Sequence, residues 1–203
     1  MRRLLTVTLA LAVALTIAGA QDKGAAPKGG GKGGGKGKGF FLPPPIKLTV
    51  AGMTDGGRFP MSNAGMAPSP ALSWTGVPMG TQAFTILLHD PDPVLNRNAS
   101  SDVTHWFIYN IPGTATSLPA GVPAGPELPD GSRQIASIGS AGYFGPAPPP
   151  GSGVHHYTFE MWALDAKIEL PTGTAPADQR NALIKAMDGH VLAKGIVIGL
   201  YGE

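Results

Sequence analysis

The chain of 203 residues contains no cysteine, and only 14% of its residues are charged. The absence of cysteine excludes disulfides, thiolate nucleophiles, thiolate metal ligands and lipid attachment through cysteine. Aromatic residues are also few, at 7%, and no apolar run reaches the roughly 20 residues of a membrane-spanning helix. Stability must therefore come from a core of aliphatic side chains and a small number of rings.

The first 20 residues have the pattern of a secretory signal. Arg2 and Arg3 precede an apolar run over 4–18, and small residues occupy positions 18–20 before Gln21. This order of charge, short apolar segment and small residues is typical of a signal peptide. We predict a signal at 1–20, cleaved after Ala20, and export to the periplasm or the extracellular space. A retained membrane anchor is the alternative.

The segment that follows, residues 21–39, contains nine Gly and five Lys and has almost no apolar residues. Such a composition cannot bury enough surface to offset the entropy lost on ordering. We therefore expect a disordered basic tail. Its positive charge could give peripheral contact with anionic polymers of the cell envelope.

The remainder, residues 40–203, has the size of one domain and a different charge from the ends of the chain. It contains eight Lys and Arg against twelve Asp and Glu, a net charge of −4, although the whole chain carries +2. A nucleic-acid-binding domain shows a basic patch on a folded face. The acidic balance of this domain therefore argues against a nucleic-acid partner.

Short runs of β-branched, aromatic and aliphatic residues, bounded by Gly, Pro, Asn or Asp, predict at least five strands in this domain. They lie at 46–51, 83–88, 104–111, 155–164 and 195–201. One helix is expected near the end, capped by Thr174, with Pro176 in its first turn and Gly189 at its end. Its apolar face comprises Ala182, Leu183, Ala186 and Met187. The pattern predicts a mostly β domain.

Polar residues cluster where three of these strands begin or end. His89 to Asp92 ends one strand, His105 opens another, and His155 to Tyr157 opens a third. Alternate residues of a strand share a face, so His155 and Tyr157 should point the same way, and His156 should point away. By the same rule His105 should share a face with Phe107. Such residues beside Gly- and Pro-rich loops suggest the rim of a shallow pocket.

Several segments together resemble the phosphatidylethanolamine-binding protein family, in its bacterial Raf-kinase-inhibitor-like branch. The resemblance lies in SPALSW at 69–74, DPD at 90–92, THWFIYNIP at 104–112, GYFGPAPPPGSGVHHYTFEMWALD at 142–165 and the closing GHVLAKGIVIGLYG at 189–202. It implies a central antiparallel sheet packed against a second, smaller sheet, with a helix in the C-terminal region. It also implies a small pocket that binds phosphate-like anions.

Matched position by position, the resemblance assigns seven ligand-binding residues. They are Asp90, Asp92, His105, Pro148, Pro149, His155 and Tyr157. The imidazoles and the phenol can donate to anion oxygens, and an Asp can accept from a P–OH or an amine. The expected ligand is a small anion or a phospholipid headgroup.

Three functions remain open. The first is an exported, non-enzymatic binding module with no catalytic residue, and the second is an inhibitor of a protease or kinase-type protein partner that acts through the loops at 93–103 and 113–150. The third is a His- and Asp-dependent phosphoester hydrolase. The sequence lacks HExxH or HxH spacing and a GxSxG motif, so we expect no metal, no cofactor and no esterase-type nucleophile.

Overall fold

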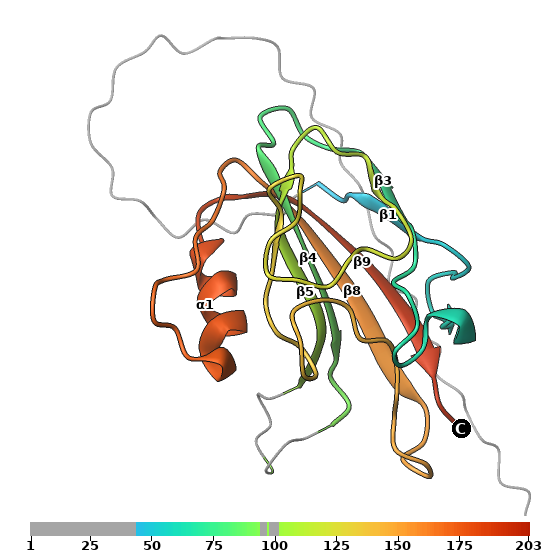
Figure 1. The fold of residues 1–203 in the computed structure, drawn as a ribbon. Coiled ribbons are helices and arrows are strands. Elements are labelled where there is room, and N and C mark those ends of the chain that lie inside the picture. The colour runs from blue at the N-terminus through green and yellow to red at the C-terminus, as the bar shows by residue number, and fades with distance from the viewer. Residues whose placement is uncertain (1–43, 94–96, 98–101) are drawn as a thin grey trace, which may run out of the picture. The chain divides into compact units, whose positions relative to one another are not determined.

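The computed structural model describes residues 44–93, Arg97 and 102–203 (Figure 1). The predicted signal at 1–20 and the predicted tail at 21–39 lie outside this part of the chain. Within it, no helix is long and apolar enough to cross a bilayer. The structure therefore bears on the predicted domain and not on the segments before it.

Two sheets form the domain. The large sheet has six strands in the order β2-β9-β8-β4-β5-β7, and the small sheet has three in the order β1-β3-β6. The strands of the large sheet are β2 (Gly57–Arg58), β4 (Ala83–Asp90), β5 (Val103–Pro112), β7 (Arg133–Gln134), β8 (His155–Leu164) and β9 (Val191–Tyr201). The small sheet contains β1 (Lys47–Val50), β3 (Leu72–Thr75) and β6 (Ser117–Leu118). The prediction of a mostly β fold with a large antiparallel sheet and a smaller one is confirmed.

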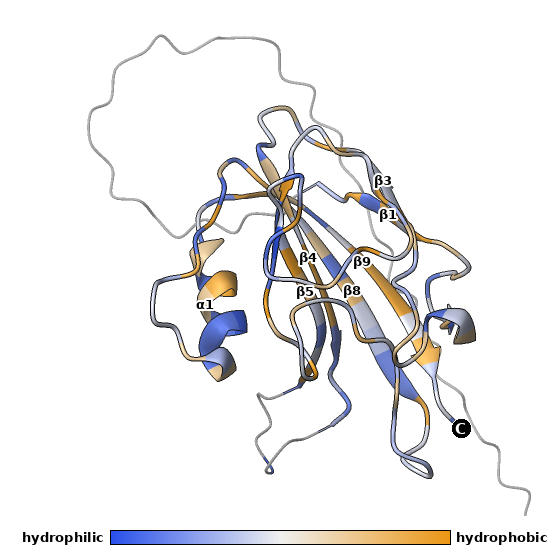
Figure 2. Ribbon diagram, viewed as in Figure 1, coloured by the Kyte–Doolittle hydropathy of each residue, from blue (hydrophilic) through white to orange (hydrophobic). Residues whose placement is uncertain are grey.

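Strand β4 lies at the centre of the large sheet and is buried on both faces, as its mostly apolar residues over 83–88 predict. On one face, Phe84, Ile86 and Leu88 pack with the small sheet in the main core. On the other face, Leu87 packs with residues of α1 (Gln179–Ala186) in a second core. Figure 2 shows the corresponding apolar colouring along the inner strands. The sheet thus separates two environments, one on each face.

The helix is confirmed, but its predicted cap is wrong. A 3-10 turn, η3 (Pro176–Asp178), precedes α1, and Ala175 occupies the cap position of this turn without a side-chain hydrogen bond. The hydroxyl of Thr174 instead donates to the carbonyl of Pro171 at 2.6 Å, within its own turn. Leu183 and Met187 are buried against the sheet, so the apolar face of the helix packs as expected.

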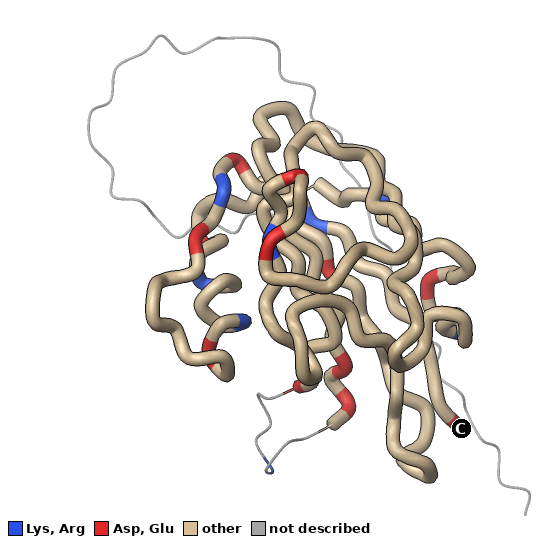
Figure 3. Tube along the Cα trace, viewed as in Figure 1, with Lys and Arg blue, Asp and Glu red and all other residues tan. Residues whose placement is uncertain are grey.

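Charged residues are sparse along the described part of the chain (Figure 3). Acidic residues gather where β4 ends and β5 begins, beside the connection between these strands: Asp90, Asp92 and Asp102. The candidate functional site lies at this end of the sheet.

Candidate functional site

A pocket of about 540 Å³ lies at the end of β4 and at the starts of β5 and β8. Its lining residues are Asp90, Asp92, Pro93, Val103, His105, Ile138, Ala147, Pro148, Pro149, Ser152, Val154, His155 and Tyr157. All seven residues assigned from the sequence are among them. The structure therefore brings together side chains that lie up to 67 positions apart, from Asp90 to Tyr157.

A β-bulge turns His105 into this pocket. Trp106 pairs with Leu88 and Thr104 pairs with His89, so His105 is an extra residue on β5 without a partner on β4. A bulge of this kind interrupts strict alternation and re-aims a side chain. The prediction that His105 shares a face with Phe107 is wrong, because Phe107 packs in the second core whereas the ring of His105 lies on the pocket side.

Two hydrogen bonds join His105 to Phe144, and one of them holds the ring. The ring Nδ1 lies 2.9 Å from the carbonyl oxygen of Phe144, and the backbone N–H of Phe144 donates to the carbonyl of His105 at 2.9 Å. A carbonyl can only accept, so the proton of the neutral ring is on Nδ1. The ring orientation and its tautomer are therefore both fixed by Phe144.

The loop that carries Phe144 is itself tied to the segment after η1 (Met61–Asn63). Gly145 donates to the carbonyl of Gly65 at 2.8 Å, and the hydroxyl of Tyr143 donates to the carbonyl of Asn63. A Cβ at Gly145 would lie 2.0 Å from the Asn63 oxygen. Glycine is therefore required there for the close approach that supports His105.

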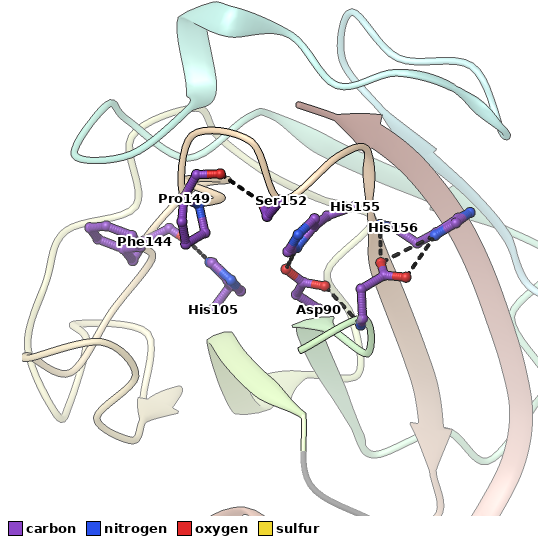
Figure 4. Close-up of polar contacts among 8 residues, drawn as sticks. Asp90, His105, Phe144, Pro149, Ser152, His155 and His156 are labelled. Carbon is purple, nitrogen blue, oxygen red and sulfur yellow. Dashed lines mark hydrogen bonds and ion pairs between the residues drawn. The ribbon is translucent and has the colours of Figure 1, made fainter. Parts of the chain in front are cut away.

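On the opposite side of the pocket, His155 and Asp90 form a buried pair. The ring Nδ1 of His155 lies 2.7 Å from Oδ2 of Asp90, and the side chains are 8% and 3% exposed. The other oxygen, Oδ1, accepts the backbone N–H of Asp92 at 3.0 Å. Figure 4 shows His105 and His155 on either side of the same space, with Asp90 beside it. Asp90 fixes the orientation of His155 as Phe144 fixes that of His105.

Asp92 lies at the more exposed edge of the pocket. Its carboxylate accepts the backbone N–H of His156 at 2.5 Å and lies 3.2 Å from the ring Nδ1 of the same residue. Burial alone would raise the pKa of Asp92, but these contacts with His156 hold it below its ordinary value. The ring of His156 is exposed and does not line the pocket, as the alternation of β8 predicts.

The ring of Tyr157 lies near both pocket imidazoles. Its ring centroid is 5.1 Å from that of His105 and 6.4 Å from that of His155. Burial raises its pKa, and the charge and hydrogen bond of Asp90 add to this effect. Burial also lowers the pKa of His105 below 6.5, against smaller opposing effects of Phe144 and Asp90. At neutral pH the phenol is therefore protonated and the ring of His105 is uncharged.

The mouth of the pocket differs from its floor. Ile138 and Val154, at 46% and 47% exposure, are two of the few large apolar side chains exposed in the described part of the chain, and both line the mouth. No Lys or Arg is among the described residues that line the pocket. Sequence reasoning missed Ile138 and Val154 because no polar signal marks them. It also missed the carbonyl of Phe144, since a backbone group leaves no trace in the sequence.

Asp90, Asp92 and His155 offer three ligand atoms that lie within 4.8 Å of one another. Carboxylate and imidazole suit transition metals. Both carboxylates, however, already accept hydrogen bonds from the protein, Asp90 from His155 and Asp92 from His156. Both carboxylates are thus already engaged by groups of the protein itself.

The two-sheet fold with a pocket at one end of the large sheet places the chain in a class of binding proteins with known relatives. The sequence model described as phosphatidylethanolamine-binding protein matches residues 49–202. The chain therefore belongs to the phosphatidylethanolamine-binding protein family, which confirms the resemblance found in the sequence.

Individual relatives agree with this assignment. A UPF0098 protein of Methanothermobacter thermautotrophicus is 41% identical over 160 residues, which cover 77% of this chain and 98% of that protein. The lipoprotein-named LppC of Mycobacterium tuberculosis is 30% identical over 158 residues, covering 76% and 73%. Among solved structures, Escherichia coli YbcL has a TM-score of 0.65 and 28% identity, covering 78% of this chain and 98% of YbcL.

Proposed function

We propose that the chain is an exported, non-enzymatic binding protein whose pocket takes a small phosphate-type anion or the phosphoryl group of a lipid head. The observation that carries this proposal is the convergence of His105, His155, Tyr157 and Asp90 on one pocket of about 540 Å³. Pockets of this size with a few convergent polar groups are typical ligand sites. The family is named for binding a phospholipid that carries such a phosphoryl group.

The arrangement of the pocket supports binding rather than turnover. The hydroxyl of Ser152, which lines the pocket, donates to the carbonyl of Pro149 at 2.6 Å, whereas a nucleophilic serine needs a base as its partner. The Nδ1 atoms of His105 and His155 are both occupied. These contacts favour a fixed recognition surface.

The test is calorimetric titration of the full chain with phosphoethanolamine. We expect weak, saturable 1:1 binding that is lost in His155→Ala, because this change removes an imidazole from the pocket and leaves Asp90 without its partner. His190→Ala is the matched control. His190 also holds a carboxylate, that of Asp165 at 2.8 Å, but it does not line the pocket and its loss should leave binding unchanged.

Absence of saturable binding in the unmodified chain, or equal binding by His155→Ala, would contradict the proposal. Release of phosphate from phosphoester substrates that depends on His155 would favour the hydrolase alternative instead.

Export is proposed on two grounds, the pattern of residues 1–20 and the lipoprotein name of the relative LppC. A mature chain that begins at Gln21 in the periplasmic or secreted fraction would support it. Retention of the chain in the cytoplasm would contradict it.

A further inference from the structure

The pocket is rich in hydrogen-bond acceptors at neutral pH, which is unexpected for an anion site. The carboxylates of Asp90 and Asp92 accept, and the described lining residues include no Lys or Arg. Tyr157 is the phenol donor of the pocket, and its pKa is raised by burial and by the charge of Asp90. An anion that entered would meet few donors and two negative charges.

The free nitrogen of His105 adds a further acceptor. Its Nδ1 proton is committed to the Phe144 carbonyl, so Nε2 of the neutral ring presents a lone pair. Nε2 has no hydrogen-bond partner among the described residues, and it is not one of their fully buried unpartnered atoms. It therefore lies at the pocket surface, although the residue as a whole is only 3% exposed.

We infer that His105 is a specificity-determining residue that selects ligands carrying their own donor, namely the P–OH of a singly protonated phosphate monoester. This inference rests on the proposed function and narrows its ligand. Nε2 of His105 accepts the P–OH hydrogen, while Asp90 and Asp92 do not oppose a monoanion as strongly as a dianion. A ligand without a donor leaves a mostly buried acceptor unpaired, and sites of this kind discriminate strongly. The lowered pKa of His105 supports the same assignment of donor and acceptor, because a ring with a lowered pKa does not readily supply the proton itself.

Two probes isolate the donor. Near pH 6 dimethyl phosphate is a monoanion without a P–OH, whereas about half of methyl phosphate is the monoanion that carries a P–OH and the rest is a dianion. Calorimetric titration of the full chain at this pH should give binding of methyl phosphate that is tighter by roughly tenfold, the value of one hydrogen bond to a buried acceptor. Sulfate, which has no proton to donate at this pH and carries two negative charges, should bind no more tightly than dimethyl phosphate.

His105→Asn is the informative variant. The Asn amide N–H can take the place of Nδ1 as donor to Phe144, but the side chain has no atom in the place of Nε2. The preference for methyl phosphate over dimethyl phosphate should fall to within about twofold, whereas the control His190→Ala should keep it. Should the variant fold poorly, ¹⁵N NMR of the unmodified chain gives a second measurement. The Nε2 signal of His105 should be that of an unprotonated nitrogen and should shift with methyl phosphate only.

Equal binding of the two esters would overturn this inference and leave the proposed function standing, whereas no binding of any phosphate probe would overturn both. Tighter binding of glycerophosphoethanolamine, a diester with an ammonium, than of methyl phosphate would assign the donor to the amine and overturn the P–OH assignment. Loss of methyl phosphate binding on adding a chelator would show that a cation at Asp90, Asp92 and His155 recruits the anion, and would also overturn it.

Discussion

Strand β4 ends in two neighbouring residues, His89 and Asp90, that each belong to a His–Asp pair. On the face towards α1, Nδ1 of His89 lies 2.5 Å from Asp102. On the face towards the small sheet, Asp90 lies 2.7 Å from Nδ1 of His155. Because adjacent residues of a strand point to opposite faces, one strand end supplies the same chemistry to two environments.

The two His–Asp pairs differ in whether a third charged side chain contacts them. Asp102 also forms an ion pair with Arg180 of α1, and Nε2 of His89 is buried with no partner among the described residues. The pair of Asp90 and His155 borders the pocket, and the described residues that line this pocket include no Lys or Arg. The same two side-chain types therefore tie α1 to the sheet where Arg180 joins them, and line the candidate site on the other face.

Removal of Arg180 should destabilise the pair of His89 and Asp102. Arg180→Met leaves Asp102 with a largely buried charge and with His89 as its remaining partner. The side chains of Arg180 and Asp102 are 22% and 14% exposed, so we expect a loss of about 2 to 3 kcal/mol in unfolding free energy, below the value for a fully buried pair. Chemical denaturation followed by tryptophan fluorescence measures it.

Arg133→Met is the control for this variant. Arg133 and Glu169 form an exposed ion pair at 3.6 Å, and such pairs contribute well under about 1 kcal/mol. Equal, small effects of the two variants would show that Arg180 does not distinguish the two faces.

On the pocket side, the position of His105 can be disturbed through the loop that contains Phe144 and Gly145. In Gly145→Ala the new Cβ meets the backbone oxygen of Asn63 at 2.0 Å, so the loop has to move away and weaken the bond from His105 to Phe144. We expect a loss of about 1 to 3 kcal/mol, as for other overpacked sites, together with a changed ring ¹⁵N signal of His105. A variant with unchanged stability and an unchanged signal would show that this loop does not hold the ring.

The long strands could be predicted from the sequence because they are rich in β-branched, aromatic and aliphatic residues and are bounded by turn residues. Strand β8 has the predicted bounds, whereas β9 begins four residues before the predicted start at 195. The strands β2, β6 and β7 have two residues each and carry no periodic signal. Their existence depends on partners distant in the chain.

The candidate site shows the same division. Its seven residues could be named from the order and spacing of the motifs, but the orientation of His105 could not. It depends on the mismatch between β4 and β5, and register is a property of two strands together. The predicted helix cap at Thr174 was wrong because its hydroxyl has another acceptor, the carbonyl of Pro171 within its own turn. The sequence alone does not show which of the two bonds forms.

The smallest expected effect concerns the protonation of His89. Burial lowers its pKa, and the positive charge of Arg180 lowers it further against weaker effects of Glu160 and Asp90. The unfolded chain, with an ordinary His pKa of 6.5, then binds a proton more readily than the folded chain. Folding stability should therefore fall as pH decreases through about 6.5, with a slope of at most about 1.4 kcal/mol per pH unit for one proton.

His89→Asn isolates this contribution, because the amide can still donate to Asp102 but does not titrate. We expect the unfolding free energy of the unmodified chain minus that of the variant to decrease when the pH is lowered from about 7.5 to about 5. These two values lie about one unit or more on either side of the ordinary His pKa. A difference that stays constant or grows towards acid would mean that the carboxylate of Asp102 outweighs burial and Arg180. The helix-side imidazole would then be charged in the folded state, and the contrast between the two faces of β4 would lie in solvent access alone.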